Sequence, residues 1–210
     1  MILVTGATGN VGRHVVSELA RTGTTVRALT RDPAAARLPD GVDVVRGDLA
    51  VPGTLDAALD GVESVFLVWP TLAADHASAE TLEMIGERAR RIVYLSANGV
   101  PDDPEKRAES ILGSHALIER LIQGSGREWT FLRPGGFAAN TLMWAPQIRA
   151  EGVVRWIHGT AARSLIHEKD IAAVAVRALT EDGHAGAKYV LTGPETLTQV
   201  QQVHAIGEAI

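Results

Sequence analysis

The sequence predicts an α/β fold built on a doubly wound, mostly parallel sheet. Short apolar runs rich in β-branched residues alternate along the chain with longer segments of helical periodicity. The short runs are nearly continuous in their apolar residues, which is typical of strands covered on both faces. A glycine-rich turn also joins the first run to the first helical segment. Repetition of strand, helix and strand in this way favours parallel βαβ units.

The first two thirds of the chain give the clearest elements. Strands are predicted over residues 1–5, 25–30, 42–46, 64–68, 91–96 and 129–133. Helices are predicted between them over residues 11–21, 53–59, 73–90 and 107–123. In the first helix Val11, Val15 and Leu19 form one apolar stripe, which would face the sheet.

The pattern loosens after Pro134. It predicts a short helix over 137–144, short strands over 153–157 and 164–167, a helix over 168–179, a strand over 188–191 and a last helix from about residue 197. We therefore expect a dinucleotide-binding core at 1–134 and a mixed segment at 135–210, within one compact unit. Part of the mixed segment would rejoin the sheet, and part would form a small, incomplete substrate side. The last helical pattern reaches Ile210 without a Gly or Asn cap signal, so either the natural protein continues or the chain was cut there.

Composition excludes several classes of protein. The chain has 210 residues with 20 basic and 25 acidic side chains, a formal net charge of −5, which argues against a nucleic-acid partner. It contains no cysteine, which excludes disulfides, thiolate metal sites and a cysteine nucleophile. No apolar run is long enough for a membrane span, and the start lacks the features of a signal peptide. The histidines lack metal-ligand spacing. We expect a soluble cytoplasmic protein with no metal and a small-molecule partner.

The turn T-G-A-T-G-N-V-G lies immediately after the first predicted strand and opens the first helix. A tight turn here needs residues without Cβ, and the helix N-terminus offers N–H groups and a favourable dipole to a phosphate. The spacing is GxxGxxG rather than the usual GxGxxG, and the alternative is an ordinary tight turn. The predicted pyrophosphate contacts are Gly6, Thr8, Gly9, Asn10, Val11 and Gly12.

The residue after the second strand bears on which cofactor binds. An NAD site usually has an acidic residue there, whereas this chain has Arg31, which suits the 2′-phosphate of NADP. Arg13 in the first helical turn could add a second contact. The alternative for Arg31 is a solvated arginine paired with Asp32. Asp48, after the third strand, could accept from the adenine amino group, although it could instead cap the following helix.

These residues carry a resemblance to a known family. The segments ILVTGATGNVG, VRALTRDP, VVRGDL, VYLSANGV and SHALIERLIQGSGREWTFLRPGGFAANTL, with the late HEKDIA, resemble the atypical short-chain dehydrogenase/reductases, and more narrowly the NmrA-like group. That group includes NADP-dependent quinone and isoflavone-type reductases and a transcription co-regulator. The resemblance implies a Rossmann-type fold and a tail of several dozen further residues. The further cofactor contacts that it implies are Leu49, Val68, Trp69, Pro70, Ser96, Pro134 and Gly135.

The usual proton-transfer residues of short-chain dehydrogenases are missing. Neither Tyr94 nor Tyr189 is followed four residues later by lysine, so the sequence has no Tyr-x-x-x-Lys motif. Ser96 stands at the family's serine position. The helical site for the tyrosine instead reads His115-Ala-Leu-Ile-Glu119, which places His115 and Glu119 on one helix face. His115 could protonate an acceptor oxygen while Glu119 orients it; the alternative is a structural helix pair.

Three functions follow from this sequence. The leading hypothesis is a reductase in which NADPH gives hydride to a quinone, enone or related carbonyl compound, with Ser96, His115 and Glu119 as the catalytic groups. Asn140 and Trp144 would line the substrate pocket. The rival is a non-catalytic NADP(H)-binding redox sensor that regulates a protein partner, with a homodimer as a further option. A nucleotide-sugar epimerase or dehydratase is the third, and it needs the tyrosine that this chain lacks.

Overall fold

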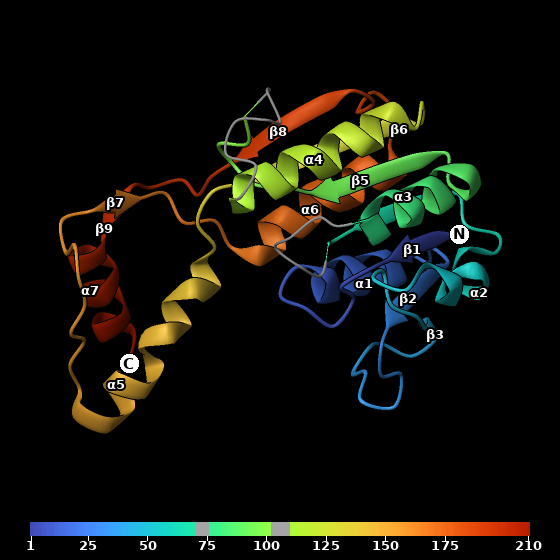
Figure 1. Ribbon diagram of the computed structural model, residues 1–210. Helices are drawn as coiled ribbons and strands as arrows, with labels where there is room; N and C mark the ends of the chain where they lie inside the picture. The colour runs from blue at the N-terminus through green and yellow to red at the C-terminus, as the bar shows by residue number, and fades with distance from the viewer. Residues whose placement is uncertain (70–75, 102–109) are drawn as a thin grey trace.

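The computed structural model describes residues 1–69, 76–101 and 110–210, and its centre is a parallel sheet (Figure 1). In the described residues the sheet has seven strands in the order β3-β2-β1-β4-β5-β6-β8, all paired in parallel. The strands are β1 (Ile2–Val4), β2 (Val26–Thr30), β3 (Asp43–Arg46), β4 (Ser64–Leu67), β5 (Arg91–Leu95), β6 (Glu128–Pro134) and β8 (Ala187–Leu191). The predicted doubly wound fold is confirmed.

Helices cover both faces of this sheet because the strands bury apolar side chains on both sides. On one face, α1 (Gly12–Arg21) and α6 (Glu168–Thr180) share a core with residues of β1 and β2. On the other face lie α2 (Asp56–Leu59), α3 (His76–Arg88) and α4 (Ile111–Gly124), after a short 3₁₀ turn η1 (Pro52–Thr54). The central strands β1, β4 and β5 are thereby buried on two sides, which explains their continuous apolar runs, whereas the edge strands β3 and β8 are partly exposed.

A smaller region lies to one side of the sheet. It comprises η2 (Ala138–Trp144), α5 (Ala145–Glu151), α7 (Gln199–Ala209) and the two-stranded antiparallel ribbon of β7 (Ala162–Arg163) with β9 (Leu197–Thr198). Figure 1 shows these elements together, away from the sheet, while α6 and β8 return to it. We retain as a proposal the division of the chain after residue 134, with the substrate side in this smaller region.

The largest departures from the predicted elements also lie in the smaller region. Residues 153–157, predicted as a strand, form neither helix nor strand, because no neighbouring strand is available to pair with them. The strand predicted at 164–167 is also wrong: the paired residues are Ala162–Arg163, and Ile166 forms only an isolated bridge to Phe137. Helix α5 was missed, although Pro146 in its first turn and the left-handed Gly152 behind it are ordinary start and stop signals.

Some predictions concern residues outside the described ranges. Pro70, expected beside the cofactor, is one of them, and so are the starts of the helices predicted from residues 73 and 107. Across the helices that the structure does describe, none combines the length and the apolar character needed to cross a bilayer.

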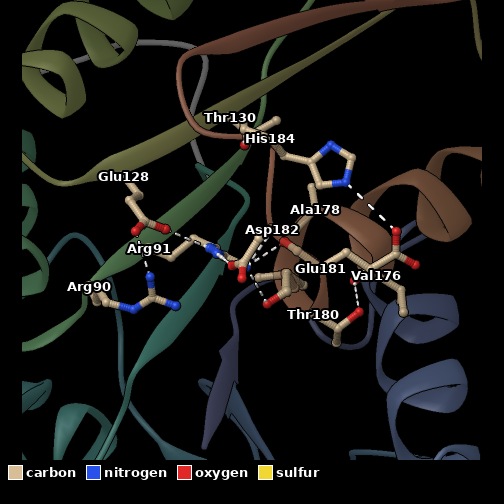
Figure 2. Close-up of polar contacts among 11 residues, drawn as sticks. Arg90, Arg91, Glu128, Thr130, Val176, Ala178, Thr180, Glu181, Asp182 and His184 are labelled. Carbon is tan, nitrogen blue, oxygen red and sulfur yellow. Dashed lines mark hydrogen bonds and ion pairs between the residues drawn. The ribbon is translucent and has the colours of Figure 1, made fainter.

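At the amino end of the sheet a buried arginine ties three elements together (Figure 2). Arg91, the first residue of β5, donates from Nε to Glu128 at 2.9 Å and from Nη2 to Asp182 at 2.7 Å. Its Nη1 donates to the carbonyl oxygens of Leu179 and Glu181 at the end of α6, at 3.2 and 2.8 Å. A cation at this position satisfies carbonyls that the helix leaves unpaired and complements the helix dipole.

Candidate functional site

The predicted site residues lie along the carboxyl edge of the sheet. Strand β1 pairs with β2 on one side and β4 on the other, so the order of the strands reverses at β1. Open α/β sheets bind ligands outside the carboxyl ends of their strands, at such a reversal. The turns that leave β1, β2, β3 and β4 contribute to one cavity there.

The glycine turn has the geometry that a phosphate cradle requires. Gly6 has φ of +58°, a conformation that L side chains rarely adopt. A Cβ on Gly12 would lie 2.1 Å from the backbone oxygen of Gly6, so helix α1 can approach the turn only without a side chain there. No side chain caps the start of α1, a stretch that the structure describes in full. The N–H groups of Arg13 and His14 donate to the carbonyls of Gly9 and Val11, at 3.2 and 2.9 Å, so an anion would be held by the positive end of the helix dipole and by N–H groups of the turn that are not engaged in this way. The residues present fit a dinucleotide pyrophosphate.

A cavity of about 360 Å³ adjoins this turn. It brings together six of the predicted cofactor residues, which are Gly6, Thr8, Arg31, Asp48, Leu49 and Val68. Gly9, Asn10 and Arg13 are exposed on the same turn and helix start, whereas Val11 is buried under it. A volume in this range is typical of small-molecule sites.

Arg31 is exposed at the edge of this cavity, and within the described chain it makes no ion pair. The alternative, a pair with Asp32, is not what the structure has. The Asp32 carboxylate accepts from the backbone N–H groups of Ala34 and Ala35, at 3.1 and 3.3 Å, and so holds the loop after β2. The Arg31 guanidinium is left facing a cavity in which a phosphate would be its natural partner.

Asp48 performs a local structural task in addition to lining the cavity. One carboxylate oxygen accepts from the N–H of Ala50 at 3.0 Å and holds the turn after β3. The alternative of a cap on the following helix does not apply, because η1 starts at Pro52 without a side-chain cap.

Thr5 is a residue that sequence reasoning missed. Its buried hydroxyl accepts from the N–H of Val68 at 2.7 Å and donates to the Val68 carbonyl at 3.1 Å. This pair of bonds fixes the end of β4 against the end of β1 at the cavity wall. The signal was available, since a threonine ends an otherwise apolar run immediately before Gly6.

Ser96, Glu119 and Arg133 form a buried polar cluster at the carboxyl ends of β5 and β6. The Ser96 hydroxyl donates to Glu119 Oε1 at 2.6 Å. Arg133 donates from Nε to Glu119 Oε1 at 3.0 Å and from Nη2 to Glu119 Oε2 at 2.6 Å. The side chains of Arg133 and Glu119 are 11% and 4% exposed. Because both carboxylate oxygens are engaged here, the expectation that Glu119 hydrogen-bonds and orients His115 is corrected.

His115 points toward the sheet and pairs with Tyr94. Its Nδ1 lies 2.7 Å from the Tyr94 hydroxyl, which is almost fully buried. Burial lowers the pKa of His115 below its ordinary value, although the Glu119 charge acts in the opposite direction. Burial also raises the pKa of Tyr94, with Glu119 adding to the effect. Both side chains are therefore neutral near pH 7, which does not favour an imidazolium proton donor.

The remaining predicted residues lie toward the smaller region. Pro134 ends β6, and Gly135 donates from its N–H to the Leu191 carbonyl at 2.9 Å. Asn140 and Trp144 both line a second cavity beyond these residues. Trp69, expected beside the cofactor, packs against the core on the α3–α4 face and is not among the residues that line either of these two cavities. No group of three or more His, Asp or Glu side chains that could hold a metal occurs in the part of the chain described.

Comparison with known proteins gives consistent results. A family model described as NAD(P)H-binding matches residues 6–182. A (4-alkanoyl-5-oxo-2,5-dihydrofuran-3-yl)methyl phosphate reductase of Streptomyces griseus is 42% identical, over 100% of this chain and 74% of its own length. An NAD(P)H azoreductase of Xenophilus azovorans is 38% identical, over 100% of this chain and 73% of its own. The crystal structure of an NADPH-dependent quinone oxidoreductase from Escherichia coli superposes with a TM-score of 0.80 at 28% identity, covering 99% of this chain and 75% of that one.

Proposed function

The chain belongs to the NAD(P)H-binding family of atypical, NmrA-like short-chain dehydrogenase/reductases, and from that premise we propose that it reduces a small conjugated acceptor such as a quinone, an enone or a related carbonyl compound. It is an NADPH-dependent reductase. The relatives reported above are named as reductases of a butenolide phosphate, an azo compound and a quinone. All three substrate classes contain a flat conjugated system that accepts hydride.

The carboxyl edge of the sheet supports this proposal through its cofactor residues. The turn from Gly6 to Gly12 would hold the pyrophosphate, Arg31 the 2′-phosphate and Asp48 the adenine amino group. The single observation that carries most weight is Arg31, a cation at the cavity edge with no ion-pair partner among the described residues. When bound there, NADPH supplies the hydride.

Ser96 has a different role in this proposal from the one expected of a proton donor. Its hydroxyl hydrogen is directed to Glu119, so its oxygen is left with lone pairs that can accept from a ligand hydroxyl or amide. Arg133 fixes the Glu119 carboxylate in place by donating to both of its oxygens. We therefore assign Ser96 to cofactor binding, with Glu119 as its positioning residue.

The proton that completes the reduction need not come from the protein. Hydride addition to a quinone or enone gives a hydroquinone anion or an enolate, and water can protonate either. His115 stays a candidate for this step, but the pairing with Tyr94 and the lowered pKa argue against it.

The test is NADPH oxidation, followed by absorbance, against a panel of quinones, enones and azo compounds. We expect turnover with at least one of these classes. His115→Ala should retain most of it, and Ser96→Ala should raise the KM for NADPH. If NADPH binds and no acceptor oxidises it, the result contradicts the reductase and favours the redox sensor. If turnover instead depends on His115, the proton donor is the one that the sequence indicated.

A further inference from the structure

A second cavity, of about 610 Å³, lies beyond the carboxyl end of β6. Its walls come from the segment that follows β6, from the β7–β9 ribbon and from the start of α7. Its polar and aromatic lining comprises Asn140, Trp144, Trp156, Arg163, Gln199 and Gln202. This size and mixed lining are typical of small-molecule sites.

Backbone contacts hold the Arg163 segment against the end of the sheet. The Ile166 N–H donates to the Gly136 carbonyl at 2.9 Å, and the Ala138 N–H donates to the Ile166 carbonyl at 2.8 Å. A Cβ on Gly193 would lie only 1.9 Å from the Leu165 carbonyl oxygen, so the chain also passes close on the other side. The β7 segment is thereby fixed beside the turn that follows β6.

These contacts bring Arg163 next to that turn. A Cβ built on Gly136 would lie 3.7 Å from Arg163 Cδ. Gly136 directly follows Pro134 and Gly135, which the family resemblance places beside the nicotinamide ring of the cofactor. The cavity therefore continues from the place where hydride would be delivered, and Arg163 is part of its wall.

The charges of the lining are one-sided. Arg163 is the only charged side chain among the described residues that line this cavity, and no described carboxylate lies within ion-pair distance of it. A guanidinium in such a wall recognises phosphate, sulfonate or carboxylate through paired N–H groups.

Two buried polar atoms of the lining also lack partners. Nε1 of Trp144 and Oε1 of Gln199 are inaccessible, and neither has a hydrogen-bond partner in the described structure. Trp144 as a whole is only 3% exposed. Because both atoms are closed to solvent, they would reach a bound group only after a local side-chain shift, and the site is therefore argued from Arg163 and the uncharged polar lining.

We propose that this cavity binds the hydride acceptor, and that the acceptor carries an anionic group which Arg163 holds. The inference rests on the proposed reductase function and adds to it the class of substrate: a flat conjugated compound with a phosphate, sulfonate or carboxylate substituent. Arg163 is a specificity-determining residue, since it contacts the substituent and not the reacting atoms. Asn140, Gln199 and Gln202 supply the uncharged hydrogen bonds of the site.

The experiment compares matched acceptors with matched variants. The acceptors are naphthoquinone, its sulfonate and its carboxylate, together with an enone phosphate ester and its dephosphorylated alcohol. The variants are Arg163→Ala, Arg163→Lys and, as a control, Arg149→Ala on the exposed surface of α5, outside the lining of the cavity.

We expect Arg163→Ala to raise the KM of at least one anionic acceptor about tenfold or more, and to leave the neutral parent within twofold. For Arg163→Lys the KM of that anionic acceptor should lie between those of wild type and Arg163→Ala, because lysine keeps the charge and loses the paired N–H geometry. The anion with the largest effect identifies the substituent. Equal losses for charged and neutral acceptors, or no change in either, would overturn the role of Arg163.

A binding measurement separates this proposal from the proposed function. Quenching of tryptophan fluorescence by each acceptor is measured with the NADP⁺-saturated protein, because Trp144 and Trp156 lie in the wall. If no acceptor is reduced but the anionic compounds bind in an Arg163-dependent manner, the site stands and the reductase function fails. If neutral quinones are reduced and no anionic preference exists in binding or in KM, the reductase stands and this site assignment fails.

Discussion

Arg91 and Arg133 lie at opposite ends of the neighbouring strands β5 and β6, and each donates to a glutamate. The side chains of Arg133 and its partner Glu119 are 11% and 4% exposed, whereas the carboxylates around Arg91, Glu128 and Asp182, are 34% and 94% exposed. Arg91 also closes the carbonyl end of α6 (Figure 2). The amino-end cluster therefore fastens elements together, while the carboxyl-end cluster fixes Ser96 at the edge where the cofactor is proposed to bind.

The largest effect is expected from Glu119→Ala. Removing the carboxylate breaks a buried ion pair in which Arg133 donates to both carboxylate oxygens, which should destabilise the protein by about 3–5 kcal/mol. Urea unfolding measures this loss directly. Glu119→Gln is the control because it keeps the shape and one acceptor, and it should lose less. If both variants lose the same small amount of unfolding free energy, the Ser96–Glu119–Arg133 cluster does not stabilise the carboxyl edge of the sheet.

Site residues that neighbour one another in the sequence could be predicted from it, whereas a cluster formed by distant segments could not. The Gly6–Gly12 turn and Arg31 were found from sequence because each is a local signal next to a strand end. The Glu119 cluster was not, since Ser96 and Arg133 come from two different strands and meet Glu119 only through the packing of α4 on the sheet. Helical spacing placed His115 and Glu119 on one face but could not show that each bonds to a different strand residue.

The same reasoning explains the errors in the smaller region. Residues 153–157 are apolar enough for a strand, but strand formation needs a partner strand that sequence alone does not supply. Arg163 escaped notice as a site residue because nothing near it in sequence distinguishes it. Its importance comes from its place in a cavity whose walls are contributed by distant segments.

Arg91→Ala tests the structural role of the cluster at the amino end of the sheet. It removes a side chain that donates to Glu128, Asp182 and the last carbonyls of α6, so the expected loss is about 1.5–3 kcal/mol of unfolding free energy. Arg91→Lys should recover only part, because an ammonium cannot form the forked contacts. The dissociation constant for NADPH, measured at a temperature where both variants are folded, should stay unchanged. A weaker affinity for NADPH in Arg91→Ala would contradict the view that the amino-end cluster stabilises the fold without contributing to the cofactor site.

A smaller effect is expected from His115 on the pH dependence of the unfolding free energy. His115 has a lowered pKa in the folded protein, so between the unfolded value of 6.5 and that lower value only the unfolded chain takes up the proton. Its contribution to stability is complete above pH 6.5 and falls as the pH is lowered through this window. His115→Gln should therefore show a flatter plot of unfolding free energy against pH. Identical plots for variant and wild type would argue against a buried neutral His115.

The smallest effect is expected from Asp182→Asn. Hydrogen bonding to Arg91 lowers the pKa of Asp182 and of Glu128, yet Asp182 is almost fully exposed and its ion pair is screened by solvent. At neutral pH the midpoint of unfolding should be unchanged within error. Because the folded pKa values are lowered, these carboxylates contribute stability above about pH 4.5 and lose it as the pH falls through the folded values. Glu128→Gln should therefore weaken the loss of stability in acid more than Asp182→Asn does.

The central claim is that the carboxyl edge binds NADPH through the glycine turn and Arg31. The most direct test is calorimetric titration of the wild type and Arg31→Glu with NADPH and with NADH. Loss of the contacts to the 2′-phosphate should weaken NADPH binding about tenfold or more and leave NADH binding unchanged or improved. Unchanged NADPH affinity, or equal weakening of both cofactors, would contradict the account.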